Sequence, residues 1–141
     1  MILVALLVSA TLLGIALLHA WWGLGGLWPA QDETTLARTV VGDGRTRMPP
    51  AWQCYAVALL LLSVAIWPWL ILALPNDHVV VAVGYVIVGV FMLRGLAVVS
   101  PRWRVHFPAE PFATNDRRVY GPVSFTIGLC FAILLSQGDT V

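Results

Sequence analysis

The stretch that decides the fold runs from residue 51 to residue 99 and reads AWQCYAVALLLLSVAIWPWLILAL, PNDH, VVVAVGYVIVGVFMLRGLAVV. The two apolar runs, 51–74 and 79–99, contain one charged residue, Arg94. Each run is long enough to cross about 30 Å of hydrocarbon as a helix, at about 1.5 Å per residue. A backbone in lipid must satisfy its hydrogen bonds within the segment, so the valine-rich second run indicates a helix and not a strand. We therefore expect a transmembrane helical hairpin.

Two further apolar runs, 2–22 and 119–137, complete a set of four. Of the 141 residues, 60% are hydrophobic and 11% are charged, which is too few charges to cover the surface of a soluble domain. The first run is not a typical cleaved signal peptide, because it lacks a positive segment and a small-x-small cleavage site. The sequence predicts an all-α integral membrane protein, an antiparallel four-transmembrane-helix bundle that forms a single domain over residues 1–141.

Arginine is distributed unevenly between the two ends of this bundle. With four spans, both termini and the 75–78 turn lie on one side, and the loops 23–50 and 100–118 lie on the other. The first side carries no arginine, whereas the second carries Arg38, Arg45, Arg47, Arg102, Arg104, Arg117 and Arg118. Such an excess is typical of cytoplasmic loops. We expect a multi-pass protein of a bacterial inner membrane with both termini external. Membrane lipid is the expected partner, and a net charge of +1 argues against nucleic acid.

Short signals predict smaller features between the spans. Asp77 precedes the third span and is suited to cap its N-terminus. A short helix along the membrane interface is expected within Asp32–Val41, ended by Gly42. The 100–118 loop is expected to be irregular because it contains Pro101, Pro108 and Pro111. Pro122 lies near the start of the fourth span, where it is either tolerated in the first turn or kinks the helix.

Arg94 is the charge inside a span, about 7.5 Å from its end along the helix axis. In the structural interpretation, its side chain extends to the cytoplasmic headgroups. In the functional interpretation, it faces the bundle and binds an anionic headgroup or substrate, or pairs with a loop carboxylate. The candidate carboxylates are Asp43, Glu110 and Asp116. Lys serves equally well in the first case, but it cannot reproduce a bidentate contact in the second.

Polar side chains occur near the cytoplasmic end of every span. Their convergence would form a pocket open to the cytoplasm or the inner leaflet, although amphipathic residues also collect at interfaces without a function. The candidate ligand-binding residues are His19, Trp22, Gln53, Arg94, Arg117 and Tyr120. No catalytic set is apparent. His19 has no second axial ligand at its depth, so neither haem nor any other metal or cofactor is predicted.

These features favour a non-enzymatic role, as an accessory protein or as a protein that binds lipid or a small molecule. The ligand would be an anionic lipid or a small molecule. The alternative is a membrane-embedded enzyme or carrier that uses the cytoplasm-facing pocket. No span contains a carboxylate, which argues against a proton-driven transporter. Small residues at four-residue spacing, such as Ala5/Ser9 and Ala10/Gly14, favour packing within the bundle, in a monomer or a weak homodimer.

Two motifs resemble those of a known family. They are HAWWGLGG at 19–26 and FATNDRRVYGP at 112–122. Similar motifs occur at the end of span one and the start of span four in a bacterial domain-of-unknown-function family of small four-span membrane proteins. The matching positions are His19, Trp22, Gly25, Gly26, Asp116, Arg117, Tyr120 and Pro122. The sequence departs from the family pattern at Trp21, where Tyr is usual, and at 121–124, where Ser-Pro-Leu-Cys is usual. The resemblance implies the four-span architecture and implies no activity.

Overall fold

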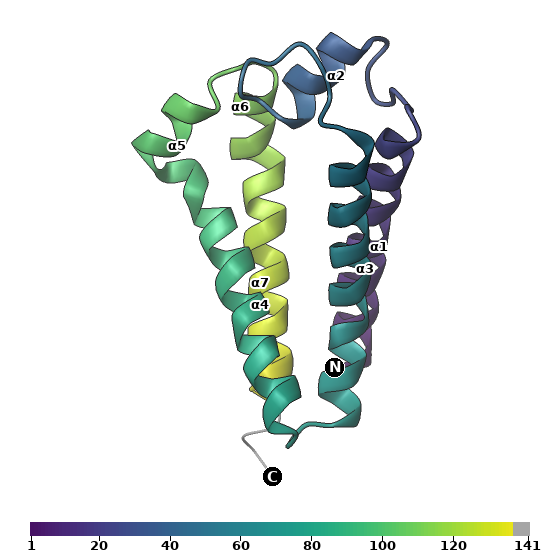
Figure 1. Ribbon diagram of the computed structural model, residues 1–141. Helices are drawn as coiled ribbons and strands as arrows, with labels where there is room; N and C mark the ends of the chain where they lie inside the picture. The colour runs from purple at the N-terminus through teal and green to yellow at the C-terminus, as the bar shows by residue number, and fades with distance from the viewer. Residues whose placement is uncertain (137–141) are drawn as a thin grey trace.

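The computed structural model describes residues 1–136, and all of its regular elements are helical. Four helices are long and apolar enough to cross a membrane: α1 (Ile2–Gly23), α3 (Ala51–Ala73), α4 (His78–Leu96) with the 3-10 turn η1 (Ala97–Val99), and the continuous helix Phe112–Leu135. The last comprises α6 (Phe112–Asn115), the π-helical turn η2 (Asp116–Tyr120) and α7 (Gly121–Leu135). Two short helices, α2 (Glu33–Val40) and α5 (Pro101–His106), lie in the loops (Figure 1). The fold is the all-α, multi-pass four-helix bundle predicted.

The first three predicted spans agree with the structure to within a few residues. The fourth begins at Phe112 and not at 119, and its predicted end at 137 lies outside the described residues. Asp77 caps α4 as expected, since one of its carboxylate oxygens accepts hydrogen bonds from Val79 N and Val80 N at 3.0 and 2.9 Å. These bonds satisfy two of the amide groups that the first turn of a helix leaves free.

The bundle is built from two helix pairs, and α1 with α3 forms the first (Figure 1). α1 buries Ala5, Leu12 and Ala16 at helical spacing, and α3 buries Ala58 and other small residues. Small side chains let the two helices approach closely, which is how helices gain contact energy in lipid. Two hydrogen bonds between the helices add to this packing.

The hydroxyl of Ser9 makes both hydrogen bonds between α1 and α3. Ser9 Oγ donates to Ala65 O at 2.7 Å and accepts a hydrogen bond from Trp69 Nε1 at 3.0 Å. Both bonds join residues of different helices, so Ser9 fixes the register of α1 against α3.

α4 and α7 form the second pair, and they pack through glycines. A Cβ atom at Gly95 would lie 2.7 Å from the backbone nitrogen of Phe125, and one at Gly128 would lie 2.8 Å from the Met92 side chain. A Cβ atom at Gly84 would lie 2.9 Å from Leu135. The Leu135 side chain can turn aside, but the atoms facing Gly95 and Gly128 include backbone atoms, so glycine at these two positions is what allows the two helices to touch.

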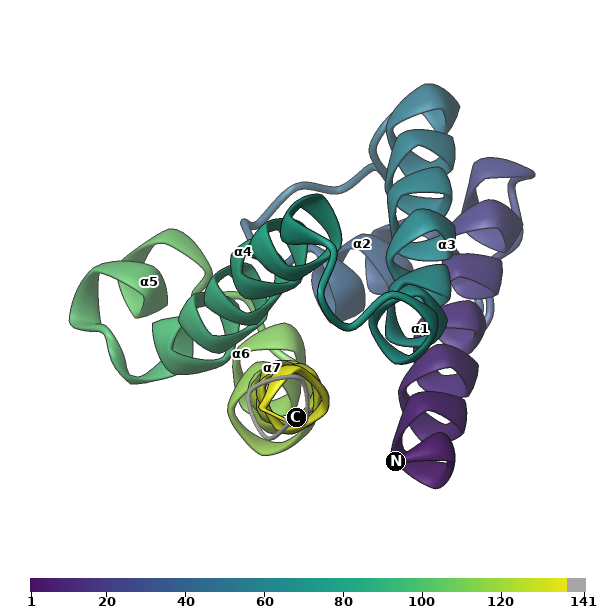
Figure 2. The same ribbon diagram turned by 90° about the horizontal axis from the view of Figure 1, so that it is seen from below.

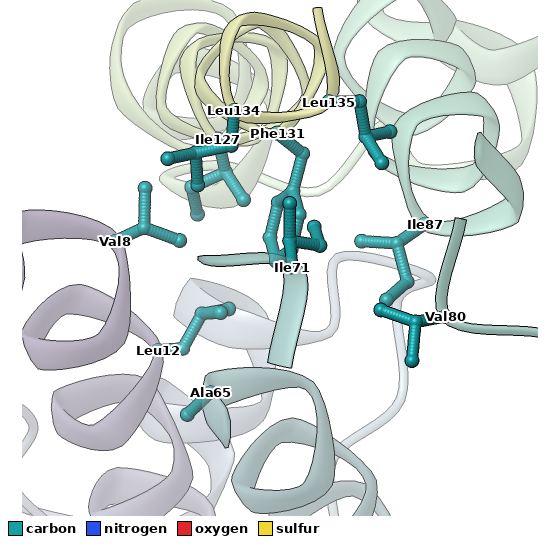
Figure 3. Close-up of a cluster of buried hydrophobic side chains, with 10 residues drawn as sticks. All are labelled: Val8, Leu12, Ala65, Ile71, Val80, Ile87, Ile127, Phe131, Leu134 and Leu135. Carbon is teal, nitrogen blue, oxygen red and sulfur yellow. The ribbon is translucent and has the colours of Figure 1, made fainter. Parts of the chain in front are cut away.

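The two pairs meet at the end of the bundle that holds the N-terminus. Their shared core consists of Val8, Leu12, Ala65, Ile71, Val80, Ile87, Ile127, Phe131, Leu134 and Leu135 (Figure 3). Away from this core, α1 and α3 lean away from α4 and α7 (Figures 1 and 2). The end that carries α2, α5 and α6 is therefore held by loop contacts more than by packing between the pairs.

Those loop contacts join the first long loop to the second. α2 forms as predicted and ends before Gly42, whose φ of +78° suits glycine. Ala109 N donates to Gly42 O at 3.1 Å, and a Cβ atom at Gly42 would overlap the ring of Phe112. The loop after α1 thus reaches across to the start of the fourth span.

The prediction that residues 100–118 are irregular was wrong, because α5 and α6 lie there. Pro101 occupies the first turn of α5 and Pro111 precedes α6, two positions where the missing N–H of proline costs nothing. Pro122 also lies in the first turn of α7, directly after the π-helical turn η2. A proline ring clashes with the carbonyl four residues before it, and the wider π-helical turn relieves that clash.

Candidate functional site

Arg94 forms an ion pair with Asp116. The Arg94 Nη2 atom lies 2.6 Å from Asp116 Oδ1, which joins the last turn of α4 to η2. The Asp116 side chain is 3% exposed and that of Arg94 is 31% exposed. Of the two interpretations of Arg94, the structure shows the one in which it pairs with a loop carboxylate, and Asp116 is the partner.

Trp103 of α5 completes this cluster. Its Nε1 atom donates to Asp116 Oδ2 at 2.8 Å, so both carboxylate oxygens accept a hydrogen bond. The Arg94 guanidinium lies over the Trp103 ring, 4.9 Å from its centroid, in a cation–π contact. Arg94 Nη1 is buried and makes no hydrogen bond to the described residues. The three side chains tie α4, α5 and η2 together.

The local fold explains why Asp116 faces α4. Within η2, the Gly121 amide bonds to Asp116 O five residues earlier. A Cβ atom at Gly121 would lie 2.6 Å from Val98 and 2.9 Å from Asp116 O. Glycine therefore allows the π-helical turn to press against the end of α4, and the extra residue of that turn rotates Asp116 toward Arg94.

A cavity of about 220 Å³, the arginine pocket, lies beside this cluster. It is lined by Val98, Trp103, Arg104, Phe107, Pro108, Glu110, Ala113, Asp116 and Arg117. Arg104 Nε donates to Val98 O at 3.2 Å, and Arg117 Nη2 lies 3.8 Å from Glu110 Oε1. Glu110 also accepts bonds from Thr114 N and Thr114 Oγ1 of α6, both at 3.1 Å. The pocket thus has two arginines at its edge.

A second, open cavity of about 320 Å³, the apolar hollow, lies against η1 and α5. It is lined by Ala97, Ser100, Arg102, Trp103, His106 and Phe107, and its surface is almost wholly apolar. Trp103 and Phe107 line both cavities, and their ring centroids are 4.4 Å apart. These two rings form the wall between the arginine pocket and the apolar hollow.

A family model described as Protein of unknown function (DUF3995) matches residues 12–131. The chain belongs to this family. The matched part includes both cavities and the Arg94–Asp116 pair, and it confirms the resemblance drawn from the two sequence motifs. No curated protein and no solved structure gives a significant match.

In this DUF3995 chain, three of the predicted site residues, Arg94, Arg117 and Tyr120, lie on α4 and η2, the two elements that the Arg94–Asp116 pair joins. Arg94 pairs with Asp116, and Asp116 and Arg117 line the arginine pocket. Tyr120 lies at the end of η2, where its hydroxyl donates to Thr39 O at 3.2 Å. Tyr120 therefore adds a further link between the first long loop and the fourth span.

The other three predicted residues do not line the pocket. His19 and Trp22 lie on α1, where the His19 Nδ1 atom is 2.9 Å from Ile15 O and the two rings are 4.9 Å apart. The Trp22 indole donates to Trp28 O at 2.8 Å. Gln53 is exposed in the first turn of α3. His19, Trp22 and Gln53 thus lie on the α1–α3 pair, which leans away from α4 and α7 at this end of the bundle (Figure 1).

The sequence analysis missed the contribution of α5. Trp103 and Phe107 form the wall of both cavities, and Arg104 lines the arginine pocket. The signal that could have found them is the run Arg102-Trp103-Arg104, in which an aromatic residue lies between two cations directly after a span. Such a pattern is typical of the membrane interface.

Proposed function

We propose that this protein is a non-enzymatic membrane protein that binds a small anionic group of the phosphate type in the arginine pocket. The observation that carries the proposal is the charge of the pocket. Its deepest carboxylate, Asp116, is already paired with Arg94, so Arg104 and Arg117 outweigh Glu110 at the edge. The excess charge of the pocket favours an anion.

Guanidinium groups suit this ligand. The planar fork of Arg matches the oxygens of phosphate and gives charge-assisted hydrogen bonds. The contact between Arg117 and Glu110 spans 3.8 Å and both side chains are about half exposed, so Arg117 can turn to a ligand at little cost. Glu110 stays bonded to Thr114 when it does.

We propose further that the end of the bundle with α2, α5 and α6 faces the cytoplasm of a bacterial cell, at the inner membrane. The support is the seven arginines of the two long loops against none on the other side. A reporter that works only outside the cytoplasm should be active when fused after Val141 and inactive when inserted beside Asp43 or Glu110. The reverse pattern would contradict this orientation.

Titration of the purified protein with phosphatidylglycerol and with glycerophosphoglycerol, its deacylated headgroup, tests the binding proposal. Native mass spectrometry would measure the first and isothermal calorimetry the second. The double variant Arg104→Gln/Arg117→Gln should weaken binding of whichever anion binds by about tenfold, which is about 1.4 kcal/mol. The matched control, Arg47→Gln/Arg118→Gln, removes the same charge from exposed positions that line neither cavity, and it should bind as the parent does. Equal losses in the two double variants, or no saturable binding of either anion, would refute the proposal.

A further inference from the structure

We infer that the anionic group belongs to a phospholipid, whose headgroup occupies the arginine pocket and whose acyl chain lies in the apolar hollow. This inference rests on the proposed function. It adds the chemical class of the ligand, because the pocket alone would serve a soluble phosphate ester equally well.

The first argument is the adjacency of the two cavities. They share Trp103 and Phe107, so the same two rings line an ionic pocket and an almost wholly apolar hollow. A soluble anion has no contact to make with the hollow. A phospholipid carries a charged group and a hydrocarbon chain on one glycerol, so it can straddle the edge of the two rings.

The second argument is the place of the hollow in the membrane. η1 and α5 follow α4 directly, so the hollow lies where a transmembrane helix ends and the headgroup region begins. The apolar side chains of Val99 and Val105 are 65% and 76% exposed on the same segment and do not line the hollow, which suits contact with the surrounding bilayer. Arg102 and His106 at the edge of the hollow are exposed, so their polar ends can stay in water while the hollow stays apolar.

The third argument is the anchoring of α5. Trp103 is held from both sides, by its hydrogen bond to Asp116 and by the Arg94 guanidinium over its ring. A wall fixed in this way keeps the two cavities at a constant separation, which is what a ligand with two joined parts requires.

The test fills the hollow and leaves the pocket intact. Ala97→Trp places a large side chain in the hollow, and Val99→Trp adds the same side chain to the same turn at an exposed position that does not line the hollow. The ligands are phosphatidylglycerol with two eight-carbon chains and glycerophosphoglycerol. We expect Ala97→Trp to weaken lipid binding by about tenfold, equivalent to about two buried methylene groups at ~0.8 kcal/mol each. Its affinity for the headgroup alone, and both affinities of Val99→Trp, should match the parent.

Two results would overturn the inference. If the two tryptophan variants bind lipid equally well, no acyl chain occupies the hollow and the inference is wrong. The proposed function would still stand if Arg104→Gln/Arg117→Gln weakened anion binding. Equal weakening of lipid and headgroup by Ala97→Trp would show that the hollow only supports the wall of the pocket. Ala97→Leu, a smaller filling, should give a smaller loss of lipid binding, and it replaces Ala97→Trp if circular dichroism shows that the latter misfolds.

Discussion

Neutralising the two members of the Arg94–Asp116 pair should have unequal effects, because they are buried to different extents. Arg94→Leu leaves the Asp116 carboxylate 3% exposed, with Trp103 Nε1 as its remaining side-chain donor. Asp116→Asn leaves Arg94, whose side chain is 31% exposed and whose long stem can carry the charge to the headgroups. The arginine has a route to water that the carboxylate lacks.

The magnitudes follow from this difference. Removing one partner of a buried ion pair costs about 3–5 kcal/mol, and we expect Arg94→Leu to fall in that range. Asp116→Asn keeps an oxygen for the Trp103 indole and frees a partly exposed cation, so about 1 kcal/mol is expected after solvent screening. The double variant contains neither charge. It should be more stable than Arg94→Leu by about 2 kcal/mol, which gives a large coupling energy in a double-mutant cycle.

Reversible unfolding in mixed detergent micelles, followed by far-ultraviolet circular dichroism, would measure these free energies. Arg94→Lys is the matched control, since it keeps the charge and the contact is made by one nitrogen atom. It should lose about 1 kcal/mol with the stacking on Trp103. Equal costs for Arg94→Leu and Asp116→Asn, with additivity in the double variant, would show that the pair is not a coupled buried unit and would refute the reasoning.

Three other variants test local features. Gly95→Ala should cost about 1–3 kcal/mol by forcing α4 from α7, whereas Gly89→Ala, with nothing within 4 Å of its new Cβ atom, should be neutral or stabilising in the same unfolding assay. Ser9→Ala should cost about 1 kcal/mol through the loss of its two interhelical bonds; no change would show that these bonds are redundant. Arg45, bonded to Asp43, holds the pKa of that carboxyl below its usual value, so this contact stabilises the loop above about pH 4 and is lost as the pH falls further. Hydrogen exchange of residues 42–46 should show that acid step in the parent and not in Asp43→Asn.

The four spans could be predicted because one property, freedom from charge over the thickness of a bilayer, decides them. The same criterion predicted the start of the fourth helix wrongly, at residue 119 and not at Phe112. Asp116, Arg117 and Arg118 look like a loop when charge alone is considered, but the pairing of Asp116 with Arg94 lets the helix begin at Phe112. Local rules of capping predicted Asp77 correctly, since that bond involves only adjacent residues.

The site could be predicted only in part, because depth along a helix is easier to obtain from sequence than rotation about it. Arg94 was singled out by its cost in lipid, and its partner was left open among three carboxylates. The choice of Asp116 depends on η2, whose extra residue changes the face that every neighbouring side chain presents. His19 and Gln53 miss the site because they lie on α1 and α3, the pair that leans away from α4 and α7 at this end of the bundle (Figure 1).

The pairing of α1 with α3, and of α4 with α7, has a consequence for how the protein is made. The helices of each pair lie in the same half of the chain, and the Pro75–His78 turn connects the two halves. The first half can finish its helix packing while the ribosome is still translating the second, and the second can then dock as a preformed unit on the core around Phe131. A chain cut between Pro75 and Asn76 keeps the contacts within each pair, so we expect its two halves to reassemble when both are made in the same membrane.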